Sequence, residues 1–251
     1  MCTSGDLLLN HDAYEGEHYQ FQWDVHILIE GTLNASIRYL DSEVRTELTK
    51  IEEAMKKPLD DEIHEHLVDE HAEVIITASR QESFLRNMVL VGLASRLTHA
   101  LRNMAKFTET FSARKGRYGN TSMSEFDRVW AEYQERFGID FVANKDRIAF
   151  VEAMQKVRNQ IVHDGSEANT FKPLNEIDWN SGEAGYLDLS FSRKYPEYVW
   201  GSGLGAEVMV SKEQLQRAIK ASVDLVGWLA EGLRKKELAS ISNSGTTTGM
   251  Q

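Results

Sequence analysis

The chain has 251 residues, of which 41% are hydrophobic and 27% charged, a length and balance typical of a globular protein with one large core or two small ones. Its single cysteine excludes a disulfide framework and a cysteine-based zinc site, and its net charge of −11 argues against non-specific coating of nucleic acid. Neither a membrane-spanning apolar run nor a signal-peptide pattern is apparent, so we expect a cytoplasmic protein without membrane contact.

The first half of the chain carries two long helical patterns. Residues 1–20 show no clear hydrophobic period and are expected to form an irregular N-terminal segment. Apolar residues then recur three and four apart, which predicts a helix over about 24–57 and a second over about 61–111, separated at Pro58. Gly92 marks a point where the second helix could kink or split.

Three further helices are expected after a basic, glycine-bearing loop at 112–121. They cover about 124–137, 145–164 and 211–236. Ser211 and Gln214 have the spacing of a capping box at the start of the last one. Residues 239–251 have the composition of a disordered tail.

A short β segment is predicted before the last helix. Hydrophobic and polar residues alternate over 186–191, which indicates a strand, and 206–210 could pair with it. The glycines between them lack the strand, helix and Lys-Ser/Thr pair of a phosphate-binding loop, so they indicate a flexible hairpin connection. The overall expectation is a single all-α helical-bundle domain over 21–238, of about five helices, with a small β-hairpin insertion.

Charge is distributed unevenly along the two long helices. Residues 41–73 hold twelve acidic against four basic residues, whereas 80–117 hold eight basic against two acidic residues. This pattern is compatible with a local basic surface on an acidic protein. It is equally compatible with two solvated helix faces of opposite sign.

The segment 148–165 (IAFVEAMQKVRNQIVHDG) contains the most informative side chains. On an ideal helix, Arg158 falls inside the apolar arc formed by residues such as Met154 and Val157, where a charge needs a partner, a polar crevice or a route to solvent. Asn159 and His163, four residues apart, share another face. A histidine in the last helical turn is well suited to proton transfer near neutral pH.

The run Arg158-Asn159-Gln160-Ile161-Val162-His163 resembles the Arg-polar-(three residues)-His motif of HEPN domains. The resemblance implies a helical bundle that acts, without a metal or cofactor, as an endoribonuclease of toxin–antitoxin or antiphage-defence systems. It also implies a homodimer in which both motifs form one cleft, and possible control by an antitoxin or other regulatory protein. By this resemblance His163 handles protons, Arg158 stabilises phosphate charge, and Asn159 orients the phosphate or the histidine.

Further candidates lie outside the motif. Arg96, His99 and Arg102 on the second helix, together with Lys156, are tentative RNA-binding residues, although a polar helix face explains the first three as well. The histidines at 64, 66 and 71 lie among acidic residues and have spacings that permit metal binding, but a solvated acidic helix is the better interpretation, so no metal is expected.

Two other functions fit the same sequence. The first is a non-catalytic HEPN-like module that binds a nucleotide or a protein partner, which the acidic net charge favours. The second is a helical scaffold that carries the motif by chance. That interpretation expects Arg158 and His163 to point to separate surfaces, far from any dimer axis. A buried salt bridge of Arg158, with Glu82 or Glu231 as the candidate partner, is a separate alternative that is compatible with catalysis.

Overall fold

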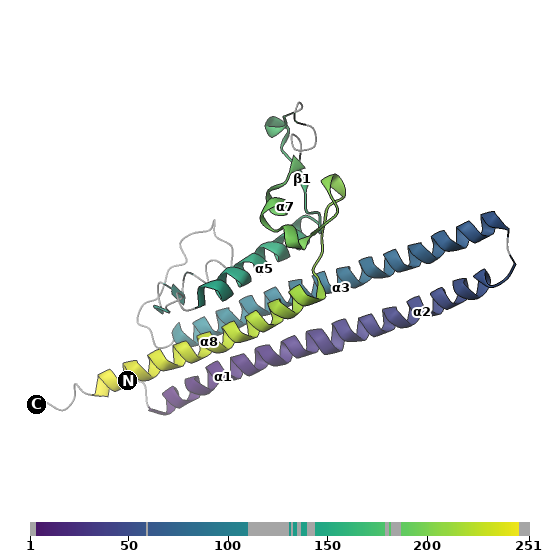
Figure 1. Ribbon diagram of the computed structural model, residues 1–251. Helices are drawn as coiled ribbons and strands as arrows, with labels where there is room; N and C mark the ends of the chain where they lie inside the picture. Colours follow the sequence, from purple (N-terminus) through teal and green to yellow (C-terminus); the bar gives the residue numbers. More distant parts are fainter. Residues whose placement is uncertain are drawn as a thin grey trace, which may run out of the picture. The chain divides into compact units, whose positions relative to one another are not determined.

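The computed structural model describes residues 4–58, 60–109, 131, 133–134, 137–139, 144–178, 181 and 187–245. Long helices dominate these ranges, and short strands occur only between α5 (Lys145–His163) and α8 (Lys212–Gly245) within them (Figure 1). The expectation of an all-α fold with a small β insertion before the last helix is therefore confirmed. None of the helices in the described ranges has a stretch long and apolar enough to span a bilayer.

The other helices precede α5 or lie within the β insertion. They are α1 (Ser4–His26), a π-helix η1 (Ile27–Asn34), α2 (Ala35–Met55), α3 (Asp61–Glu109) and the short α7 (Ser190–Lys194). Three 3₁₀ turns, Leu174–Glu176, Pro196–Tyr198 and Gly203–Gly205, connect parts of the insertion.

The contacts within the chain divide it into two compact units. The first comprises Met1–Val25, Leu93–Gln155 and Gln216–Gln251, and the second comprises His26–Gly92 and Lys156–Leu215. Helices α3, α5 and α8 each contribute residues to both units. The expectation of a single domain over 21–238 accordingly stays a prediction.

Two predicted irregular segments are helical instead. Helix α1 occupies most of the segment 1–20, and its buried residues Tyr14, Phe21 and Val25 are spaced seven and four apart, too sparsely to give a visible stripe. Helix α8 continues to Gly245, so the expected tail over 239–251 is helical over its first residues. Residues 246–251 and most of the predicted helix 124–137 lie outside the described residues.

Gly92 permits a close helix contact rather than a break. Helix α3 runs through it without interruption. A Cβ atom at Gly92 would lie 3.1 Å from Leu28 Cδ2, in the π-helix of the same unit. A larger side chain would therefore push against Leu28, so the glycine allows η1 to approach α3 closely.

The core of the first unit is formed by apolar stripes on α3, α5 and α8. Members of all three stripes are at most 2% exposed, namely Leu93, Leu97, Leu101, Met104, Val151, Met154, Leu225, Leu229 and Leu233. Burying one such side chain contributes about 1.5–3 kcal/mol, so these stripes hold the three helices together. Helix α1 is joined to α3 by the edge-to-face contact of Tyr14 with Phe107, at 6.3 Å between ring centroids.

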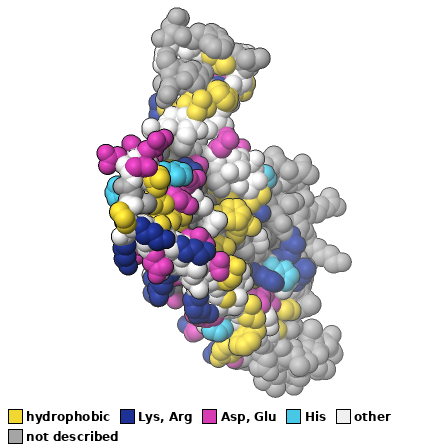
Figure 2. All heavy atoms as spheres, turned by 90° about the vertical axis from the view of Figure 1, so that its right-hand side faces the viewer, with side chains coloured by type: hydrophobic (Ala, Val, Ile, Leu, Met, Phe, Trp, Pro, Cys, Tyr) yellow, Lys and Arg dark blue, Asp and Glu magenta, His cyan; other side chains and the backbone are white. Residues whose placement is uncertain are grey.

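In the second unit α2 and the first part of α3 lie side by side as an antiparallel hairpin (Figure 1). Figure 2 shows acidic and basic side chains interspersed on the face it presents, with hydrophobic side chains between them. Exposed apolar residues of α3 in this unit include Val68, Ile75 and Ile76.

The strands of the insertion pair differently from the expectation. Strand β2 (Leu187–Asp188) pairs with β1 (Thr170–Phe171), and β4 (Glu207–Val208) pairs with β3 (Val199–Trp200), both antiparallel. The expected pairing of 186–191 with 206–210 is therefore wrong. Two-residue strands are too short to show an alternating pattern, so their partners could not be identified from sequence.

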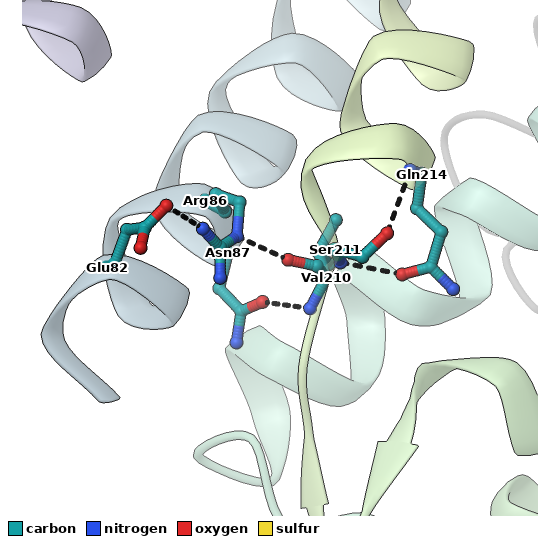
Figure 3. A network of polar contacts seen from close by, with 6 residues as sticks. All are labelled: Glu82, Arg86, Asn87, Val210, Ser211 and Gln214. Carbon is teal, nitrogen blue, oxygen red and sulfur yellow. Dashed lines mark hydrogen bonds and ion pairs between the residues drawn. The ribbon is translucent and has the colours of Figure 1, made fainter. Parts of the chain in front are cut away.

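A side chain of α3 joins the insertion to the rest of the second unit. Asn87, which is 3% exposed, donates from Nδ2 to the Val208 carbonyl at 2.8 Å and accepts from the Val210 amide at 3.1 Å. Arg86 Nε donates to the Val210 carbonyl at 2.7 Å, and the same guanidinium pairs with Glu82 (Figure 3). The Asn87 side chain thus satisfies one backbone group in β4 and one just after it, as the backbone of a neighbouring strand would.

Candidate functional site

The three motif residues occupy the last turns of α5. Arg158 and Asn159 are half-buried, and His163 is exposed in the last turn. The Arg158 Nη1 atom donates to Asn159 Oδ1 at 2.9 Å, which holds the guanidinium close to its neighbour on the helix. A cation held in place can stabilise negative charge on a phosphate, and an accessible imidazole can transfer protons to or from it.

Arg158 is half-buried on the apolar side of α5. Within the apolar arc Met154, Val157 and Ile161 are buried, whereas Arg158 keeps partial exposure, as expected of a side chain whose charged end reaches solvent. Glu82 pairs with Arg86, and Glu231 pairs with Lys235 at 3.0 Å. Among the described residues of the second unit, no ion pair joins Arg158 to Glu82, and Glu231 belongs to the first unit.

Arg158 and His163 point in different directions on one helix. Residues five apart on a regular α-helix are separated by about 140° around the axis. No hydrogen bond or ion pair joins the two side chains in the part of the chain that the structure describes. Asn159 and His163, by contrast, share a face.

The chain after His163 is fixed by contacts on both sides. Gly165 and Ser166 adopt left-handed conformations, with φ of 61° and 71°, which turn the backbone away from the helix. Gln160 Nε2 donates to the Glu167 carbonyl at 2.7 Å, and the Ala168 amide donates to the Ala206 carbonyl at 2.9 Å. Because Asn87 holds the chain after β4, the motif end of α5 is connected through β4 to α3.

The tentative RNA-binding residues fall into different units. Lys156 is exposed in the second unit, whereas Arg96, His99 and Arg102 belong to the first. Arg96 Nη1 lies 3.5 Å from Asp24 Oδ2, so this arginine faces a carboxylate of α1 rather than a purely basic surface. Arg102 is exposed.

Arg96 and His99 line one small pocket between α1 and α3, which we call the Glu17 pocket. Its volume is about 190 Å³, and it is lined by Glu17, Gln20, Phe21, Asp24, Arg96, His99, Ala100 and Asn103. Burial raises the pKa of Glu17, an effect opposed by the hydrogen bond from Asn103 and by His99. Glu17 could not be identified from the sequence, because the segment around it lacks a helical stripe.

The histidines of α3 near the hairpin tip include one that contacts a carboxylate of α2. His71 Nε2 lies 4.0 Å from Glu52 Oε1 on α2, the distance of a weak, partly exposed contact. Among the described residues, no group of three or more histidine, cysteine or carboxylate side chains is arranged to hold a metal ion.

The chain was compared with known proteins at three levels. No family model, no curated protein and no solved structure matches it significantly. Inference about function accordingly depends on the chain's own residues.

Proposed function

We propose that this chain is a metal-independent endoribonuclease of the HEPN type, acting as a toxin or antiphage-defence effector. The observation that carries the proposal is the placement of Arg158, Asn159 and His163 on the last two turns of α5, with His163 exposed and Arg158 hydrogen-bonded to Asn159. The toxin or defence role, and an antitoxin or regulatory partner, follow from the resemblance to HEPN proteins.

The proposed reaction is attack of an RNA 2′-hydroxyl on the adjacent phosphorus. The new O2′–P bond forms as the P–O5′ bond breaks, which leaves a 2′,3′-cyclic phosphate and a 5′-hydroxyl end. His163 takes the proton from the 2′-hydroxyl or supplies one to the leaving oxygen. Arg158 stabilises the charge on the phosphate oxygens, and Asn159 orients Arg158 through their hydrogen bond.

The proposed active unit is a homodimer. The separation of about 140° between Arg158 and His163 around α5 disfavours their meeting at one phosphate within a single copy. Two α5 ends related by a two-fold axis would place Arg158 of one copy opposite His163 of the other. The exposure of His163 leaves it available for such an arrangement.

The direct test is RNA cleavage by the full chain in the presence of a chelator. His163→Ala and Arg158→Ala are expected to lower the cleavage rate at least about 100-fold, because proton transfer alone contributes about 10²–10⁴-fold. Circular dichroism should remain that of the original chain. His64→Ala, which removes an exposed histidine of α3, is the matched control and should cleave normally. Equal rates for all variants would refute the assignment.

A second candidate is a non-catalytic HEPN-like module that binds a nucleotide or a protein partner. The net charge of −11 favours it, because an acidic protein has weak general attraction for RNA. Absence of cleavage by the purified chain, together with tight nucleotide or protein binding, would support this alternative instead.

A further inference from the structure

The Glu17 pocket contains both hydrogen-bond acceptors and donors within the first unit. Acceptors come from α1, where Glu17 and Asp24 present carboxylates, and donors come from α3, where Arg96 and Asn103 face them. Phe21 and Ala100 add apolar surface. At about 190 Å³ the pocket is smaller than drug-sized sites of roughly 300 Å³ and above, so it suits a ligand of the size of one ring system.

Within this pocket Asp24 accepts a hydrogen bond of 2.9 Å from Gln20 Nε2, whereas Glu17 is only weakly satisfied by its neighbours. Asn103 Nδ2 lies 3.4 and 3.3 Å from the two oxygens of Glu17, and the Arg96–Asp24 pair is separated by 3.5 Å. These distances exceed the 2.7–2.9 Å of good charge-assisted hydrogen bonds. A ligand could therefore form stronger bonds with Glu17 than the pocket forms with itself.

Asn103 contacts two other residues of the pocket, Glu17 and His99. Its amide nitrogen lies 3.1 Å from His99 Nε2 and can donate one hydrogen there while the other is directed to Glu17. Both Glu17 oxygens lie on the side of Asn103, at 3.4 and 3.3 Å from its Nδ2, and together they can accept an entering pair of N–H groups.

We propose that the Glu17 pocket binds a guanine base. The Glu17 carboxylate accepts hydrogen bonds from guanine N1–H and the exocyclic N2 amine, which no other common base presents side by side. Arg96 donates to O6 or N7, the atoms that arginine commonly contacts on guanine. Adenine places an unprotonated N1 on the same edge, which the Glu17 carboxylate would repel.

A guanine of single-stranded RNA presents this base edge to the Glu17 pocket. The exposed rings of Tyr19 and Trp23 do not line the pocket, since Tyr19 lies about 160° around α1 from Glu17 and Phe21. A free guanine nucleotide has the same base edge, so the experiment must distinguish these two sources.

The test measures binding to the full-length His163→Ala variant, so that cleavage does not interfere. In the first arm the probes are GMP and IMP, which differ only by the N2 amine. In the second arm the probes are two labelled RNAs, UUGUU and the same sequence with inosine in place of guanosine. Loss of the amine leaves one Glu17 oxygen without its partner, so guanine should bind about tenfold more tightly than its inosine counterpart. A preference seen only in the RNA arm identifies RNA as the source, and one seen only with GMP identifies a free nucleotide.

Glu17→Gln is the matched variant, because it keeps the side-chain size and replaces one accepting oxygen with a donor. It should abolish the preference for guanine over inosine, whereas Glu15→Gln, on the same helix outside the pocket, should retain it. Equal affinities of the guanine and inosine probes in both arms would overturn the proposal. So would a preference that survives in Glu17→Gln. Neither result depends on whether the chain cleaves RNA.

Discussion

Asn87 is the residue whose contribution can be measured most directly. Its amide satisfies two backbone groups, the Val208 carbonyl and the Val210 amide, at a position that is 3% exposed. Asn87→Ala leaves both groups without this partner inside the protein. Because each unsatisfied buried group costs about 1–3 kcal/mol, we expect a loss of about 2–6 kcal/mol in the free energy of unfolding, measured in urea.

The control for this measurement is Asn175→Ala, which truncates an exposed asparagine in the insertion and should change stability by less than about 0.5 kcal/mol. A loss below about 1 kcal/mol for Asn87→Ala would show that water replaces the amide easily. Sequence could not reveal Asn87, because its partners lie more than 120 residues further along the chain. Arg158, Asn159 and His163, by contrast, could be proposed as a site from their spacing on a single helix, and that proposal stays a prediction.

At the level of elements, the start of α8 depends on a reciprocal cap. The backbone amide of Gln214 donates to Ser211 Oγ at 3.1 Å. The backbone amide of Ser211 donates to the side-chain oxygen Oε1 of Gln214 at 2.7 Å (Figure 3). Ser211→Ala removes one of these bonds and should lower the free energy of unfolding by about 1 kcal/mol. Lys212→Ala, at the exposed neighbouring position, is the control; equal losses from both changes would argue against the cap.

This cap was predictable because its two residues are three apart and need no distant partner. The boundaries of α3 and α5 were predictable for the same reason, since proline, glycine and the apolar stripes are local signals. Helix α1 was missed because its buried aromatic residues have polar neighbours. The β pairs were misassigned because strand partners are chosen by the tertiary fold, which a two-residue segment does not encode.

At the level of the whole molecule, the proposed homodimer makes a prediction that single substitutions cannot test. Light scattering should give twice the chain mass of 28.5 kDa. Arg158→Ala and His163→Ala chains, each inactive alone, should regain part of the cleavage activity when mixed and allowed to exchange subunits. The mixed dimer would contain one intact Arg158 and one intact His163 on opposite copies.

Mixing each inactive variant with more of itself is the control and should restore nothing. A strictly monomeric protein that still cleaves RNA would contradict the composite site. The dimer could not be derived from the composition of the chain, because an acidic, helical protein is compatible with many assembly states. It is suggested by the directions of two side chains on one helix.

The hydrogen bond from Asn87 to Val208 joins residues 121 positions apart, which has a consequence for synthesis in the cell. At about 5–20 residues per second, a ribosome needs roughly 6–24 s to translate from the first of these residues to the second. Throughout that interval the nascent α3 lacks the strand that Asn87 anchors, and once α5 has been translated its last turn lacks its connection to α3 until β4 follows. The growing polypeptide therefore completes the surroundings of its Arg-Asn-His motif only after most of its length has been translated.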